Sequence, residues 1–214
     1  MVYVIQSGRY ETGTPEQQMG FRQLFGEEVQ YRFDLYFHWY NLIHELGHIL
    51  VSQSNLKLTD IQEEMFVNEF AVSYYRYVGE NPRLYDLQRI LQEIIDQMPA
   101  PMPAGESFLE YYTRIWNTAE LMQVMTYGYF QLNSVLEAMK KQRSLEDIAG
   151  DLEVRMNHAP TKTYKEEISS NAAEKVLQTA ITNLRQLNFP VPEVRLQLMD
   201  DPSIQCARRE DETK

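Results

Sequence analysis

The chain has 214 residues, of which 43% are hydrophobic and 24% are charged, and this composition predicts a globular protein with one sizeable core. A net charge of −11 at pH 7 argues against a nucleic-acid partner and against binding to an anionic membrane surface. Cys206 is the single cysteine, which excludes an intramolecular disulfide and a cysteine-based zinc site.

The N-terminal segment lacks both the basic start and the long apolar stretch of a signal peptide. No run in the sequence is long and apolar enough to predict a transmembrane helix. The use of one cysteine is typical of a reducing compartment. We therefore expect a cytoplasmic protein that works without a membrane.

The first predicted elements lie in the N-terminal quarter of the chain. Residues 2–6 form a β-branched and aromatic run that predicts a strand, and the polar residues 7–20 predict a loop. Residues 31–37 alternate in hydrophobicity, which leaves strand and helix open. Helical periodicity follows over residues 35–51, with Asp34 as the candidate N-cap.

A second helix is expected from residue 60 to 77 after a connector over residues 52–59. Thr59 or Asp60 can cap it, and Gln62 and Glu63 are placed for a capping box. The proline-rich residues 98–107 predict a loop, and the last residues, 201–214, predict a flexible tail. Further helical patterns cover residues 82–97, 108–141 with a break near Gly128, 144–153, and 165–187, where Pro190 and Pro192 stop the helix.

These elements predict a single α+β domain over residues 1–214 that is mainly helical. We expect the helix over residues 35–51 to lie beside a small N-terminal sheet, followed by a C-terminal helical region that begins at residue 108. No repeat, low-complexity segment or long linker divides the chain.

The segment His44-Glu45-Leu46-Gly47-His48 carries the chemistry. At about 100° per residue, His44 and His48 lie one turn apart on one helix face, and the apolar residues of the helix lie on the opposite face. Two imidazoles on one face can bind a zinc ion. Glu45 lies at the edge of that face, where it can take a proton from a metal-activated water.

Chance could also place two surface histidines on an amphipathic helix. Three features favour the metal motif: the chain has only four histidines, Ile49-Leu50-Val51 makes the end of the helix apolar, and Gly47 stands inside the helix. A glycine there costs about 1 kcal/mol relative to alanine. Gly47 therefore predicts that a strand or a substrate approaches the backbone closely.

A zinc site of this type needs a third protein ligand. Glu64 fits best, because His48 and Glu64 lie at similar distances from the connector between their helices. Asn68 follows Glu64 by one turn and can hydrogen-bond a ligand imidazole. We expect Glu63 and Glu69 to have solvated surface roles. His38 lies off the metal face, and His158 is remote in sequence.

A family resemblance appears at these residues. The stretch from His44 to Leu50, followed by Glu64, Asn68, Phe70 and Ala71, resembles the ImmA/IrrE-type zincins, small bacterial and phage metallopeptidases that cleave repressors. Val67 stands where that family usually has alanine. The resemblance implies that Glu64 is a zinc ligand and that Glu45 is the general base, and it covers only residues 44–71.

Other interpretations use the same residues. Asn68-Glu69 resembles the Asn-Glu pair of thermolysin-like gluzincins, which would make Glu69 the ligand, although Ser73 stands one position late for that pattern. Glu45 and His48 form a Glu-x-x-His pair as in di-iron bundles, but the chain has no second pair. A catalytically silent zincin-like regulatory or binding module is the remaining alternative.

The sequence thus predicts a zinc-dependent metallopeptidase that cleaves a protein or peptide substrate. His44, His48 and Glu64 bind Zn²⁺, Glu45 is the general base, and Asn68 orients a ligand. Candidates for hydrogen bonding to the oxyanion, or for lining the substrate cleft, are Tyr112, Tyr127, Tyr129, His158, Phe37 and Tyr40.

Overall fold

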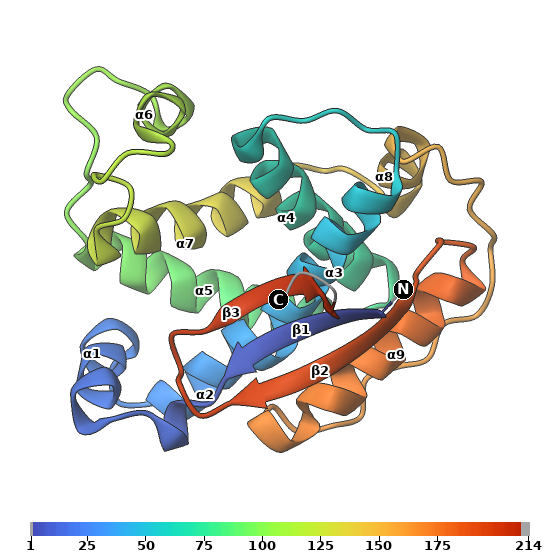
Figure 1. Ribbon diagram of the computed structural model, residues 1–214, viewed down its shortest axis with the longest axis horizontal. Helices are drawn as coiled ribbons and strands as arrows, with labels where there is room; N and C mark the ends of the chain where they lie inside the picture. Colours follow the sequence, from blue (N-terminus) through green and yellow to red (C-terminus); the bar gives the residue numbers. More distant parts are fainter. Residues whose placement is uncertain (1, 211–214) are drawn as a thin grey trace.

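A three-stranded sheet lies in front of the helices in the view of Figure 1, which shows the computed structural model; the structure describes residues 2–210. Its strand order is β2–β1–β3, with β1 (Val2–Gly8), β2 (Glu193–Met199) and β3 (Gln205–Arg209). The central strand β1 runs parallel to β2 and antiparallel to β3. The two ends of the chain therefore meet in one sheet.

The fold class is the predicted one, α+β and mainly helical, and β1 confirms the strand expected at the N-terminus. The sheet, however, is completed by strands from the C-terminal region. The expectation of a flexible tail is wrong for residues 205–209, which form β3, while residues 211–214 lie outside the described residues. The backbone of the buried β1 needs hydrogen-bond partners along both edges, and β2 and β3 supply them. Both of these strands are half-exposed, so their sequences lack the strong hydrophobic pattern that predicts a strand.

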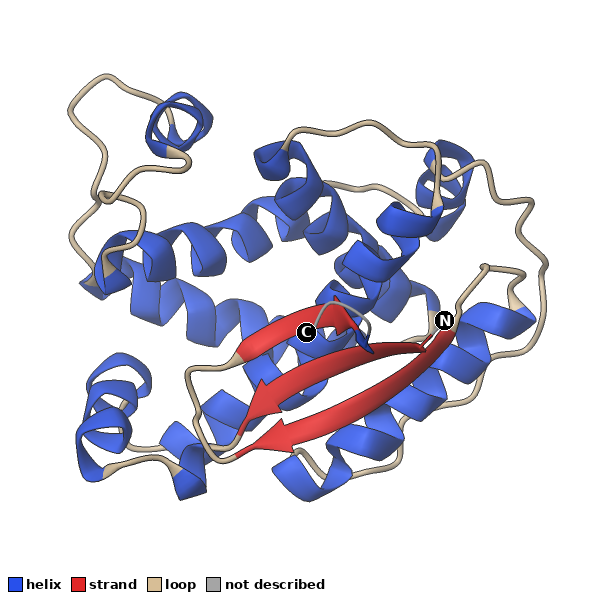
Figure 2. Ribbon diagram, in the orientation of Figure 1, coloured by secondary structure: helices blue, strands red, loops and turns tan. Residues whose placement is uncertain are grey.

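One side of the sheet is covered by helices. Figure 2 shows them behind the strands, and α3 (Asn41–Gln53) packs against β1 and β3 while α9 (Ala173–Gln186) packs against β2. α3 continues from α2 (Val29–Phe33) through a π-helical segment, η2 (Asp34–Tyr40). The apolar side of α3 is thereby buried between the sheet and the other helices.

The π-helical segment corrects the prediction that Asp34 caps the active-site helix. Asp34 has helical backbone angles, and its carboxylate contacts His38 Nδ1 at 2.6 Å. His38 Nε2 lies 3.0 Å from the carbonyl oxygen of Gly8, so this ring joins the helix to the end of β1. Both groups of the pair are buried, and their role is structural.

The predicted loop over residues 7–20 is also wrong. The segment contains a 3-10 turn, η1 (Tyr10–Thr12), and the start of α1 (Pro15–Phe25). Thr14 and Gln17 form a capping box, and Pro15 stands at the first helical position, where its missing N–H costs nothing. This start signal is present in the polar sequence, although the segment lacks an apolar run.

The remaining helices follow the predicted pattern with two exceptions, and one of them is that the helix expected from residue 165 begins only at Ala173. The structure has α5 (Asn81–Gln97), α6 (Phe108–Ile115), α7 (Val124–Lys140), α8 (Leu145–Asp151) and the 3-10 turn η3 (Ser170–Ala172) before α9. The expected break near Gly128 lies instead at residues 116–123, where Trp116 leaves helical angles and Asn117 has a φ of 64°. Within residues 2–210, no helix is both long and apolar enough to cross a bilayer.

α4 (Asp60–Tyr77) begins at the predicted capping box of Thr59 and Gln62 and packs closely on α3. A Cβ atom at Gly47 would lie 2.9 Å from Val67 Cβ and 3.0 Å from Phe70 Cδ1. The close approach predicted at Gly47 is confirmed, and the approaching element is a helix. Glycine on α3 therefore lets α4 come near enough for side chains of both helices to share a site.

We predict that Gly47→Ala destabilises the protein by about 1–3 kcal/mol, because the added methyl group overpacks the contact with Val67. Val67→Ala in the same chain should restore part of that loss. Gly20→Ala in α1 is the matched control, since a Cβ there meets no described residue within 4 Å and should stabilise the helix. Urea unfolding measures all four proteins, and equal effects at Gly47 and Gly20 would contradict the account.

Candidate metal centre

The structure brings His44, His48 and Glu64 together at the α3–α4 contact. His44 and His48 project from successive turns of α3, and their Nε2 atoms lie 3.3 Å apart. Glu64, near the start of α4, places Oε2 3.5 Å from His44 Nε2 and Oε1 3.5 Å from His48 Nε2. Among residues 2–210, this is the group of His, Cys, Asp or Glu side chains whose spacing suits one metal ion.

The spacing of these atoms fits a zinc ion. Four tetrahedral ligands with Zn–N and Zn–O bonds of 2.0–2.2 Å stand about 3.3–3.5 Å from one another. The facing atoms of His44, His48 and Glu64 have those separations. Glu64 Oε2 is buried and has no hydrogen-bond partner among the described residues, so a bound cation would satisfy it.

The orientation of His44 is set by Asn68 of α4. His44 Nδ1 lies 3.1 Å from Asn68 Oδ1, and Asn68 Nδ2 donates to the backbone oxygen of Glu64. Tyr40 also donates to Asn68 Oδ1, at 2.9 Å, so the amide oxygen faces the ring. The contact predicted for Asn68 is thus present. It leaves the Nε2 lone pair of His44 directed at the site.

His48 is oriented by Glu63, which corrects the prediction of a solvated surface role for that carboxylate. Glu63 Oε1 lies 2.7 Å from His48 Nδ1. Burial lowers the pKa of His48, but this hydrogen bond and the charges of Glu64 and Glu45 outweigh burial, and the pKa lies above its ordinary value. The two adjacent carboxylates on α4 therefore have different roles. Glu64 faces the Nε2 atoms of both histidines, whereas Glu63 contacts the Nδ1 atom on the other side of the His48 ring.

Burial controls the charge of the other two proposed ligands. It is the main cause that lowers the pKa of His44 to about 3, which keeps this imidazole neutral at pH 7 and ready to donate a lone pair. Burial, with a smaller contribution from the nearby carboxylate of Glu45, raises the pKa of Glu64 to about 7 against the opposing charge of His48. The assembled groups favour a positive charge between them.

Glu45 stands beside this group as a buried carboxylate, 8% exposed. Asn41 Nδ2 donates to its Oε1 at 3.2 Å. Burial raises its pKa, whereas the charge of His48, the Asn41 hydrogen bond and a hydrogen bond from the Ala207 backbone lower it. The structure thus places Glu45 at the site, on α3, next to the edge strand β3.

Glu69 lies outside the site, and the alternative in which it completes the metal site is wrong in geometry. It is buried, and its carboxylate pairs with Lys141 and with Arg143, the latter at 3.0 Å. Five helical residues separate it from Glu64, a rotation of about 140° around α4. The ion pair also replaces the solvated surface role predicted for Glu69.

The candidates for oxyanion stabilisation divide into near and distant groups. Burial is the main cause that raises the pKa of Tyr127 to about 12, and the charges of the nearby Glu64 and Glu45 also raise it. Tyr112 instead donates to the backbone oxygen of Thr126, away from the ligands. His158 is exposed, and Tyr129 is buried on the inner side of α7.

Tyr36 is a site residue that the sequence analysis missed. Burial and the charges of Tyr127, Glu64 and Glu45 raise the pKa of this tyrosine, so its hydroxyl stays protonated beside the carboxylates. It lies in the π-helical segment, whose wider turns change the facing of residues 34–40 relative to α3. A prediction that assumes a constant rotation of about 100° per residue therefore cannot show that Tyr36 faces the site. Phe37 packs instead among Phe21, Phe25 and Phe33.

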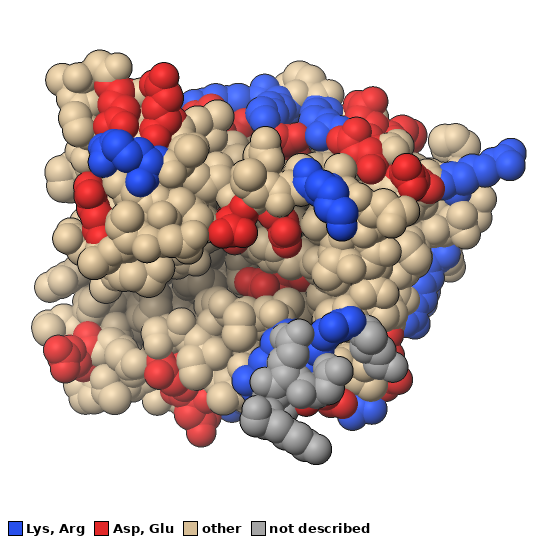
Figure 3. All heavy atoms as spheres, turned by 45° about the horizontal axis from the view of Figure 1, so that its top comes forward, with Lys and Arg blue, Asp and Glu red and all other residues tan. Residues whose placement is uncertain are grey.

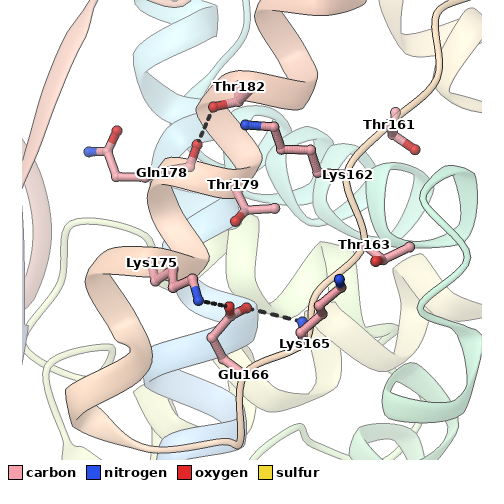
Figure 4. A pocket seen from close by; sticks show the side chains of 9 residues that line it. All are labelled: Thr161, Lys162, Thr163, Lys165, Glu166, Lys175, Gln178, Thr179 and Thr182. Atoms are coloured by element: carbon pink, nitrogen blue, oxygen red, sulfur yellow. Dashed lines mark hydrogen bonds and ion pairs between the residues drawn. The ribbon is translucent and has the colours of Figure 1, made fainter.

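A hollow crosses the face of the molecule shown in Figure 3, and acidic side chains lie at its centre. It separates the part built from α4, α6 and α7 from the part that carries the sheet and α1 (Figure 1). A second hollow, of about 550 Å³, lies between residues 161–166 and α9 (Figure 4). Its lining includes Lys162, Lys165 and a Lys175–Glu166 ion pair, and it shares no residue with the His-His-Glu group.

Comparison of the chain with protein-family models, with curated proteins and with solved structures finds no match. The functional argument therefore depends on the geometry of the site.

We predict that the protein binds one zinc ion per chain and that Glu64→Gln weakens this binding by more than the 10–100-fold loss typical of groups that only orient a ligand. Glu69→Gln should keep the zinc affinity and lower stability by on the order of 1 kcal/mol, because it weakens the pair with Lys141 and Arg143. Chelator competition measures the affinities. A loss of zinc on changing Glu69 rather than Glu64 would reverse the assignment.

The contact between Glu63 and His48 leads to a second prediction. Glu63→Ala should weaken zinc binding by about 10–100-fold, since the imidazole loses the acceptor that fixes its orientation. Glu63→Gln retains an acceptor oxygen and should keep most of the affinity. Equal affinities for the wild type and Glu63→Ala would show that this carboxylate has no part in metal binding.

Proposed function

We propose that the protein is a zinc-dependent metallopeptidase that hydrolyses a protein or peptide substrate. The proposal rests on the spacing of His44, His48 and Glu64, whose facing atoms are 3.3–3.5 Å apart beside the buried carboxylate of Glu45. Three protein ligands leave one position free, as in catalytic rather than structural zinc sites. The resemblance to ImmA/IrrE-type zincins supports a protein as the substrate.

Bound zinc would supply a Lewis acid that polarises the peptide carbonyl and makes a water molecule more acidic. Glu45 accepts the proton of that water as the water oxygen forms its bond to the carbonyl carbon. The carboxyl group then donates the proton to the amide nitrogen as the C–N bond breaks. Burial raises the pKa of Glu45, which suits a group that must hold a proton between these two steps.

Tyr36 and Tyr127 are the groups we assign to the developing negative charge on the carbonyl oxygen. Both hydroxyls stay protonated near neutral pH, because burial and the neighbouring carboxylates raise their pKa values. A protonated phenol can donate a hydrogen bond to an oxyanion. The two residues come from separate elements, η2 and α7, so a carbonyl oxygen that accepts from both hydroxyls would be held in one orientation.

The edge of the sheet supports an extended polypeptide as the substrate. Within residues 2–210, β3 pairs with β1 alone, and α3, which carries Glu45, packs against β3. An unpaired strand edge offers backbone donors and acceptors to a peptide. A peptide aligned along β3 would pass Glu45, which brings its carbonyl groups to the proposed base.

The alternatives predict different measurable properties. A di-iron site would need further carboxylates around a second ion, and the described residues hold the one His-His-Glu group. A catalytically silent module would bind zinc in the same place and hydrolyse nothing. The burial of Glu45 favours an enzyme over a silent module, because burying a carboxylate lowers the stability of the fold and a silent module would have no use for it.

We predict that Glu45→Gln keeps the zinc affinity of the wild type and lowers peptide hydrolysis by about 10²–10⁴-fold, since the amide cannot accept the proton of water. Glu64→Gln is the control that should lose both zinc and hydrolysis. Cleavage of a mixture of unstructured peptides, read by mass spectrometry, gives the rates. Wild-type protein that binds zinc and cleaves none of them would favour the silent module.

A further inference from the structure

Exposed apolar side chains gather at the start of α7, next to the proposed centre. Eight large hydrophobic residues are exposed among the described residues, and four of them lie within residues 122–127. We call these four residues the apolar rim: Met122, Val124, Met125 and Tyr127. Val124 is 85% exposed, so its side chain contributes almost nothing to the protein's own core.

The apolar rim is connected to the metal centre along one face of α7. Gln131 Nε2 donates to the hydroxyl of Tyr127 at 2.9 Å, and α7 packs against α4, the helix that carries Glu64. Val124, Tyr127 and Gln131 are spaced by three and four residues, so they lie on one helix face. That face leads outward from Glu64, through Tyr127, to the exposed side chain of Val124.

Gly128 leaves room beside this face. Among the described residues, a Cβ atom there would meet only Met98 Cε, at 4.0 Å. The residue nevertheless lies inside a helix, where glycine costs about 1 kcal/mol relative to alanine. Met98 is a partly buried apolar residue at the end of α5. The space at Gly128 is therefore bordered by the apolar Met98 at the end of α5, and Gly128 directly follows the proposed oxyanion donor, Tyr127.

We propose that the apolar rim, with Gly128 and Met98, forms a subsite for a bulky apolar side chain of the polypeptide substrate, next to the peptide bond that is cleaved. The inference rests on the proposed function and adds a specificity to it. An extended peptide has alternating side chains. When its backbone lies at the metal centre, one of its side chains reaches the start of α7. Burial against Val124 and Met125 removes apolar surface of both partners from water.

The test compares two fluorescein-labelled ten-residue peptides of glycine and serine, one with a central leucine and one with a central serine. Binding is measured by fluorescence anisotropy on zinc-loaded protein that carries Glu45→Gln, so that no cleavage occurs. We expect the leucine peptide to bind at least about tenfold more tightly. Adding Val124→Ser with Met125→Ser, or adding Gly128→Leu to fill the space, should reduce the preference to about twofold or less.

Tyr85→Ser is the matched control, because Tyr85 is 67% exposed on α5 and lies outside the apolar rim. This variant should keep the full preference for leucine. Equal binding of the two peptides, or a preference that survives Val124→Ser with Met125→Ser, overturns the subsite. A wild-type dimer that the same double variant dissociates in sedimentation also overturns it, because the rim would then be a subunit interface.

The apolar subsite and the proposed peptidase function can be refuted separately. If the leucine preference depends on the rim but the wild type hydrolyses neither peptide nor any in a wider mixture, the peptidase proposal fails and the apolar subsite stands. If the wild type hydrolyses peptides without regard to apolar residues, the peptidase proposal stands and the subsite fails.

Discussion

The close packing of α4 on α3 at Gly47 is the constraint on which the site depends. The absence of a side chain at Gly47 allows Val67 to approach the α3 backbone, and the helices are then near enough for Glu64 to face both imidazoles. The same approach brings Asn68 to the ring of His44. A wider separation would leave two histidines on one helix and a glutamate on another, with no common space between them.

Burial then gives the site its electrostatic character. His44 is held neutral, and the carboxylates of Glu64 and Glu45 are held close together in a medium that disfavours their charge. Folding therefore places several acceptors around a small space that suits a cation. The clearest sign of this arrangement is the buried Oε2 of Glu64, which has no hydrogen-bond partner within residues 2–210. Glu63, at the edge of the site, holds His48 from outside.

Much of this site could be predicted, because helix periodicity and helix capping are local properties. The faces of His44 and His48 follow from one helix, and Glu64 and Asn68 follow from the start of the next helix at Thr59. Tyr36 and β3 could not be predicted in the same way. The facing of Tyr36 depends on a π-helical turn, and β3 is a short, half-exposed strand that pairs across nearly the whole chain.

The central claim is that one metal ion is shared by α3 and α4 through two histidines and a single glutamate. An anomalous-difference map, measured at the zinc absorption edge on crystals of the zinc-loaded protein, tests it most directly. The account predicts one peak between the Nε2 atoms of His44 and His48 and the carboxylate of Glu64. Two adjacent peaks, a peak at Glu69, or no peak at these histidines would contradict it.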